Sequence, residues 1–80
     1  MVTVVGLGFV GLTTALGFAE YGHKVYGIEA DPNRLAMIRE GRIPFEEPGL
    51  EDALARHLGG NFIPRSLAYT ISDVPIESFP

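Results

Sequence analysis

The sequence contains no cysteine and few basic side chains, with six lysines and arginines against ten acidic residues. Without cysteine, these residues form no disulfide, no thiolate metal site and no cysteine nucleophile. The net charge of −4 leaves no basic surface that would neutralise the phosphates of a nucleic acid or of an acidic membrane. These shortages argue against nucleic-acid and membrane partners.

Charged side chains are also missing from the N-terminal segment, where Glu20 is the first. Such a segment raises the possibility of a signal peptide or a membrane span. A signal peptide would need a basic region, whereas Met1 leads directly into the strand-like run 2–5 and then into glycines. Glycines accompanied by Thr13 and Thr14 suit a packed interior better than lipid, so we expect a cytoplasmic protein.

The length and composition predict a compact unit with a small margin of stability. The apolar fraction of 46% and the charged fraction of 20% are ordinary for a globular protein. A chain of 80 residues buries only around 60% of the surface that its unfolded form exposes. We expect these residues to form part of a domain and to be too few for a complete enzyme.

The hydrophobic pattern changes period along the chain, which marks alternating strands and helices. Residues 2–5 form a β-branched run without polar alternation, typical of a strand buried on both faces of a parallel sheet. Asp31 followed by Pro32 is typical of a helix start, with an N-cap oxygen before a proline at the first helical position. The predicted strands are 2–5, 24–28 and a weak one within 66–71, and the predicted helices are 9–21, 32–40 and 50–58.

This order, β-α-β-α-α-β, predicts an α/β fold in which right-handed crossovers build a short parallel sheet with the first strand beside the second. It corresponds to the first half of a doubly wound, three-layer domain. We expect residues 1–80 to form one partial domain, with an ordered core over 1–71 and a tail over 72–80.

Gly6, Gly8 and Gly11 form a G-x-G-x-x-G pattern directly after the first strand and at the start of the first helix. In that position, backbone N–H groups and the positive end of the helix dipole point at a diphosphate. Gly6 then permits the tight turn, Gly8 lets the backbone approach the diphosphate, and Gly11 lets the helix lie close to the sheet. The alternative is that the glycines only pack a strand–helix turn.

Glu29 ends the second strand, about 20 residues past the glycines, where an acidic residue accepts hydrogen bonds from an adenosine ribose. A carboxylate there repels the additional phosphate of NADP, which favours NAD as the cofactor. Asp31 competes for this role, but Pro32 assigns Asp31 to helix capping. The alternative for Glu29 is a solvated strand end.

The chain resembles the UDP-glucose/GDP-mannose dehydrogenase family, of the UDP-glucose 6-dehydrogenase type, over roughly residues 1 to 60. The resemblance rests on the order and spacing of four segments, Gly6–Leu12, Gly22–Val25, Glu29–Pro32 and Glu47–Leu50. An aromatic residue followed by Val-Gly-Leu, combined with Glu-Pro-Gly-Leu, is much more specific than the glycine pattern alone. The resemblance implies a partial Rossmann fold that binds NAD.

The resemblance further implies an NAD-dependent double oxidation of the C6 hydroxyl of a nucleotide sugar to a carboxylate. By position, the backbone N–H groups of Phe9 and Val10 would face the diphosphate, Glu29 the ribose, and Arg34 the adenosine side. The alternative for Arg34 is a solvated arginine near Glu29. The nucleotide sugar would be bound only by the remainder of the enzyme.

The chain departs from the family pattern at two positions. Glu29 stands where the family more often has aspartate, which is a mild change. Glu46 stands where the family commonly has an aromatic residue, so no role is carried over to Glu46 or Glu47, which we expect in a solvated acidic loop. His23 and His57 are expected to be structural or solvated.

The catalytic cysteine, lysine, asparagine and aspartate of the family occupy later positions, so we predict no catalytic residue and no metal ligand here. We expect the isolated chain to be inactive. The alternatives are the N-terminus of another Rossmann dehydrogenase, such as the 3-hydroxyacyl-CoA type, or a non-catalytic assembly or cofactor-sensing module.

The complete fold flanks its first strand with a fourth strand that this chain does not reach. We therefore expect weak cofactor affinity and self-association through the exposed edge of the first strand.

Overall fold

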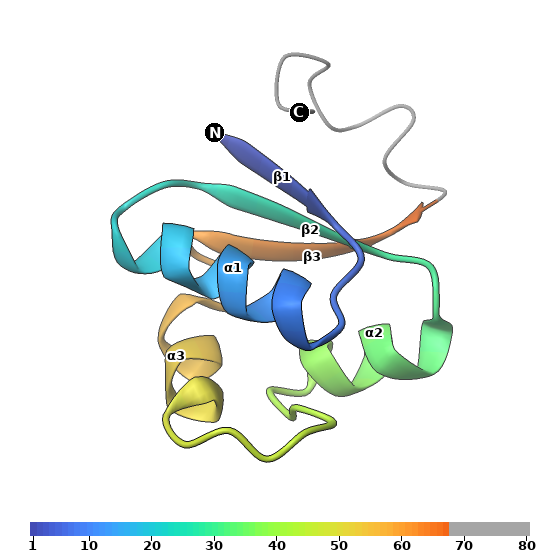
Figure 1. Cartoon of the computed structure of the whole chain (residues 1–80). Coiled ribbons are helices and arrows are strands. Elements are labelled where there is room, and N and C mark those ends of the chain that lie inside the picture. Colours follow the sequence, from blue (N-terminus) through green and yellow to red (C-terminus); the bar gives the residue numbers. More distant parts are fainter. Residues whose placement is uncertain (68–80) are drawn as a thin grey trace.

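The computed structural model describes residues 1–67 and contains three strands and three helices (Figure 1). In chain order they are β1 (Val2–Val5), α1 (Phe9–Glu20), β2 (Val25–Glu29), α2 (Pro32–Arg39), α3 (Leu50–His57) and β3 (Phe62–Ser66). The predicted order β-α-β-α-α-β is confirmed, and the first five elements agree with their predicted ranges to within one residue.

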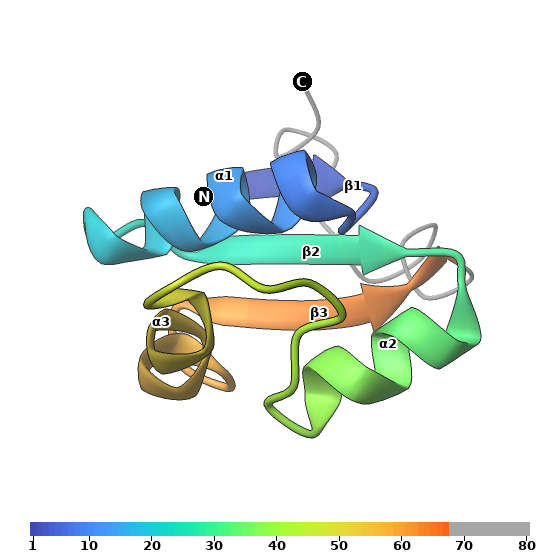
Figure 2. The ribbon, with the colours of Figure 1, turned by 60° about the horizontal axis from the view of Figure 1, so that its bottom comes forward.

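The strands form one parallel sheet in the order β1-β2-β3, which confirms the predicted pairing of the first two strands. Helices α1, α2 and α3 all lie on the same face of this sheet (Figures 1 and 2). The chain moves across the sheet in one direction, from β1 to β2 to β3. Because both crossovers have the same hand, their helices lie on the same face. Residues 1–67 thus show the sheet and one helical layer of the expected three-layer arrangement.

The third strand corrects a prediction, because β3 spans Phe62–Ser66 and not residues within 66–71. Residues 68–71 and the predicted tail 72–80 lie outside the described residues. The prediction failed because Pro64 interrupts the strand-like run, and a proline cannot donate to a sheet ladder. The Asn61 carbonyl accepts from the Val25 N–H at 2.7 Å. Successive residues of a strand point their backbone groups to opposite edges, so residue 64 faces the outer edge of β3. The N–H that Pro64 lacks is therefore not needed for pairing with β2.

The hydrophobic core lies between the sheet and the three helices. Each helix contributes residues at helical spacing, and β2 and β3 contribute one strand face, because side chains alternate across a sheet. The largest of these core side chains are Leu7, Leu12, Leu16, Val25, Ile38, Leu54 and Phe62. Leu7 is notable because it belongs to the glycine turn and not to a helix or strand, so the turn itself is anchored in the core.

An ion-pair cluster joins the C-terminal ends of α1 and α3. Arg56 donates to Glu20 Oε1, and His57 Nε2 lies 3.3 Å from the same oxygen. The Arg56 guanidinium, with His57 as a smaller contribution, holds the pKa of the Glu20 carboxyl below its usual value. Because Glu20 is exposed, this cluster contributes little to stability.

The helices within residues 1–67 are too short to cross a membrane, since none offers a sufficiently long apolar span.

Candidate dinucleotide-binding site

The glycine pattern forms a tight turn between β1 and α1. Gly6 has φ +88°, a left-handed conformation that side chains disfavour, and its N–H donates to the Ile28 carbonyl of β2 at 2.7 Å. Leu7 then enters the core with no exposed surface, and α1 begins at Phe9. Residues 6–8 are therefore a turn and not part of the helix, as the predicted site requires.

The glycines at positions 8 and 11 have different surroundings. A methyl group built on Gly8, which has φ −70° and ψ −166°, would meet no atom within 4 Å. The same group on Gly11 would lie 1.7 Å from the Gly6 carbonyl oxygen and 3.7 Å from a Val4 methyl. Gly11 therefore allows α1 to lie against the turn, and only secondarily against the sheet. By contrast, no contact within residues 1–67 requires glycine at position 8.

The N-terminus of α1 lacks the usual capping groups among the described residues. Its N-cap is Gly8, no side chain caps it, and its first turn contains no acidic residue. The first helical hydrogen bond runs from the Leu12 N–H to the Gly8 carbonyl at 2.9 Å. The N–H groups of Phe9, Val10 and Gly11 thus have no acceptor within the helix, and they carry the positive end of its dipole. Such an end suits an anion.

Glu29 lies beside this helix start and is 5% exposed. Its Oε1 accepts from the Leu7 N–H at 2.8 Å and its Oε2 from the Asp31 N–H at 2.9 Å. The carboxylate thus fixes the glycine turn to the end of β2, a bracing role that sequence reasoning missed. A carboxylate has about four acceptor positions, so acceptor capacity remains for hydroxyl groups.

Asp31 caps α2, as predicted from the proline that follows it. Its Oδ1 accepts from the Asn33 N–H at 2.9 Å and from the Arg34 N–H at 3.4 Å. The side chain of Arg34 lies beside Glu29, with its Nη1 at 3.6 Å from Glu29 Oε1, and it is 39% exposed. Arg34 therefore borders the site and retains access to solvent.

The loop between α2 and α3 also reaches the start of α1. Its Phe45 ring meets the Phe9 ring edge to face, with centroids 5.5 Å apart and an angle of 82°. Sequence reasoning missed this contact because it joins residues of two distant segments. Ile43 is buried and Phe45 half-buried against the core, so the loop is fastened on its apolar side.

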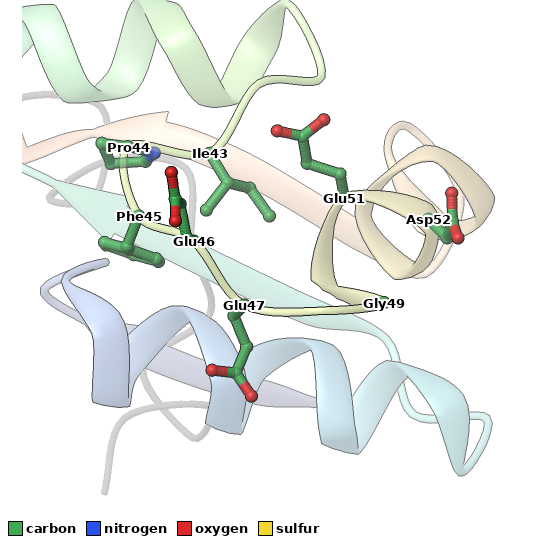
Figure 3. Close-up of a pocket in the computed structure, with 8 residues that line it drawn as sticks. All are labelled: Ile43, Pro44, Phe45, Glu46, Glu47, Gly49, Glu51 and Asp52. Carbon is green, nitrogen blue, oxygen red and sulfur yellow. The ribbon is translucent and has the colours of Figure 1, made fainter.

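The same loop lines a surface pocket of about 450 Å³ (Figure 3). Its acidic side chains do not converge: those of Glu47 and Glu51 point to opposite sides of the loop in Figure 3. Glu46 and Glu47 are exposed, in agreement with the expected solvated acidic loop. Residues 1–67 contain no group of three or more potential ligands that would hold a metal ion.

The two histidines lie away from the glycine turn. His23 follows α1, and its ring contacts the Phe18 ring edge to face, with centroids 5.8 Å apart. His57 belongs to the ion-pair cluster with Glu20 at the far end of the same helix. Their structural roles agree with the prediction.

A glycine turn that opens a helix beside a carboxylate, at the end of the neighbouring parallel strand, defines a Rossmann-type dinucleotide-binding unit. The model of the NAD binding domain of the UDP-glucose/GDP-mannose dehydrogenase family matches residues 1–76. The chain belongs to this family. That assignment decides against the alternative of a 3-hydroxyacyl-CoA type dehydrogenase.

Named relatives agree with the family match. The UDP-glucose 6-dehydrogenase of Pseudomonas aeruginosa is 49% identical over 55 residues, which are 69% of this chain and 12% of that protein. A solved UDP-glucose dehydrogenase from Pyrobaculum islandicum is 43% identical with a TM-score of 0.75, over 80% of this chain and 15% of that one. A UDP-D-ManNAc dehydrogenase from Pyrococcus horikoshii is 27% identical with a TM-score of 0.81, over 90% and 18%. The chain thus spans less than a fifth of each of these proteins.

Proposed function

We propose that this chain binds NAD at the start of α1 and forms the cofactor-binding part of a nucleotide-sugar 6-dehydrogenase. The observation that carries the proposal is the uncapped N-terminus of α1, held next to the Glu29 carboxylate by the bond from the Leu7 N–H. The family match to an NAD binding domain supports the same cofactor.

The residues present fit this cofactor at three points. Open space surrounds Gly8 on the side where a methyl group would project, so a diphosphate can approach the backbone. Unbonded N–H groups in the first turn of α1 are suited to its oxygens, and an anion at a helix end typically gains about 0.3–1 kcal/mol. The buried carboxylate of Glu29 keeps unused acceptor positions for a ribose.

Each residue of the proposed site has its own role in binding the cofactor. Gly6 makes the turn, Gly8 admits the diphosphate, and Gly11 lets α1 approach the turn. The N–H groups of Phe9 and Val10 donate to the diphosphate oxygens. Glu29 accepts from the adenosine ribose, and Arg34 borders the adenosine side.

Calorimetric titration tests the cofactor assignment. NAD should give a saturable heat, and NADP should bind at least about tenfold more weakly because its extra phosphate meets the Glu29 carboxylate. Equal binding of the two would contradict the ribose role of Glu29. Absence of saturable NAD binding would favour a non-catalytic assembly module.

The whole reaction requires residues outside this chain. When bound, NAD would supply the hydride acceptor: oxidation of one C6 hydroxyl to a carboxylate transfers two hydrides, one to each of two NAD molecules, and takes up one water molecule at the aldehyde stage. The described residues bind and orient this cofactor, and none of them is proposed to touch the sugar. The isolated chain should therefore turn over no nucleotide sugar.

We also propose that the isolated chain self-associates through the outer edge of β1. The Val2 and Gly6 N–H groups donate to the β2 side, so the backbone groups of Thr3 and Val5 face the other edge. Among the described strands none pairs with that edge, and Val5 is 60% exposed. An apolar strand with unpaired N–H and C=O groups recruits a second copy.

Light scattering across a concentration series tests this association. The chain should move from monomer toward dimer at micromolar concentrations, and Val5→Lys should stay monomeric because a charge at a strand edge opposes pairing. Thr14→Lys, which adds the same charge on the exposed side of α1, should still associate. A stable monomer at high micromolar concentration would contradict the proposal.

A further inference from the structure

The start of α1 is weakly restrained by its own sequence. Its first turn is preceded by glycine, has no side-chain cap and contains no acidic residue. Helix ends without side-chain caps fray more easily, and a glycine N-cap is weaker than a capping side chain by a few tenths of a kcal/mol. The groups proposed to meet the diphosphate therefore belong to a turn that no side chain caps.

Besides the burial of Leu12 in the core, a contact from another segment restrains this turn. Phe9, its first residue, is 48% exposed and meets the ring of Phe45 edge to face at 5.5 Å. Phe45 is itself packed against the core, and the neighbouring Ile43 is buried. The contact thus links the first turn of α1 to a part of the loop between α2 and α3 that is packed on the core.

We propose that Phe45 is a positioning residue for the cofactor diphosphate. By holding the Phe9 ring, it keeps the N–H groups of Phe9 and Val10 in place before the ligand arrives. It occupies the role that a capping side chain has in other helices and leaves the helix end free for an anion. This inference rests on the proposed NAD site and adds to it a residue from the loop between α2 and α3.

Two leucine substitutions test the proposal, since the chain offers a matched control. Phe45→Leu keeps an apolar side chain against the core but removes the edge-to-face contact. Phe18→Leu removes the equivalent contact with His23 at the other end of the same helix. Phe45→Tyr retains the ring, so this variant should bind NAD as the unmodified chain does.

The measurement is an NMR titration with NAD that follows the amide signals of Phe9 and Val10. Phe45→Leu should weaken NAD binding about three- to tenfold, the range of an aromatic pair contact. The Phe18→Leu and Phe45→Tyr variants should bind like the unmodified chain. Hydrogen exchange of the Leu12 amide, which makes the first bond of α1, should accelerate only in Phe45→Leu.

Phe9→Leu provides a second route should Phe45→Leu fold poorly. It removes the same contact from the exposed side, so Phe9→Leu alone should weaken NAD binding by about the same three- to tenfold. Equal NAD affinity of Phe45→Leu and the unmodified chain would overturn the positioning role alone. The same loss in Phe18→Leu would also overturn it, since the effect would then be general. Failure of the unmodified chain to bind NAD would instead overturn the proposed function, and the positioning role with it.

Discussion

Replacing Gly8 by alanine should weaken NAD binding strongly and leave the fold intact. A methyl group on Gly8 meets no protein atom within 4 Å and the φ of −70° is open to alanine, so the folded chain tolerates it. Alanine is a poorer N-cap than glycine, but it also lowers the entropy of the unfolded chain, and the two effects nearly offset. The unfolding free energy should change by less than about 1 kcal/mol.

The cofactor responds differently because its diphosphate would occupy the space that the methyl group fills. NAD affinity should fall at least about tenfold, which corresponds to about 1.4 kcal/mol. Calorimetry measures the affinity, and urea denaturation measures the stability. An alanine variant that binds NAD normally would show that the diphosphate does not pass over position 8, and the site would have to be redrawn.

Replacing Gly11 by alanine should have the opposite result, a large loss of stability. The added methyl group would lie 1.7 Å from the Gly6 carbonyl oxygen, and neither backbone segment can move without displacing the turn. Overpacking of this kind costs about 3 kcal/mol. A domain of this size has a total stability of roughly 4–12 kcal/mol. The variant should therefore lose between about a quarter and three quarters of the unfolding free energy of the chain.

Gly17→Ala is the matched control, because it makes the same change on the same helix. Gly17 is exposed and a methyl group there meets nothing within 4 Å, so alanine should stabilise the chain by about 0.5–1 kcal/mol. NAD affinity should not change. Urea denaturation that ranks the Gly11 and Gly17 variants as equally stable would contradict the packing role of Gly11.

The features that were predicted correctly depend on residues close together in the sequence. The cap of α2 follows from Asp31 and Pro32, which are adjacent. The turn follows from glycines within six residues after a β-branched strand. Local chemistry determines both, because a proline fixes one dihedral angle and a left-handed turn selects glycine.

The features that were missed depend on contacts between distant residues. The bond from the Leu7 N–H to Glu29 joins residues 22 positions apart, and Phe45 meets Phe9 from another loop. Neither leaves a periodic signal, since each is made only after the sheet and the crossovers have formed. The place of Glu29 at the strand end predicts a role at the ribose, but its hydrogen bond to the glycine turn is visible only in three dimensions.

Pro64 has a consequence for the growth of any assembly of this chain. It removes a donor from the outer edge of β3, so the two edges of the sheet differ. The β1 edge can pair with another strand, whereas the β3 edge pairs less readily. When two copies pair through β1 in a symmetric contact, the β1 edge of each copy is fully paired. Such a pair is closed to further addition, and the chain should stop at a dimer and not build fibres.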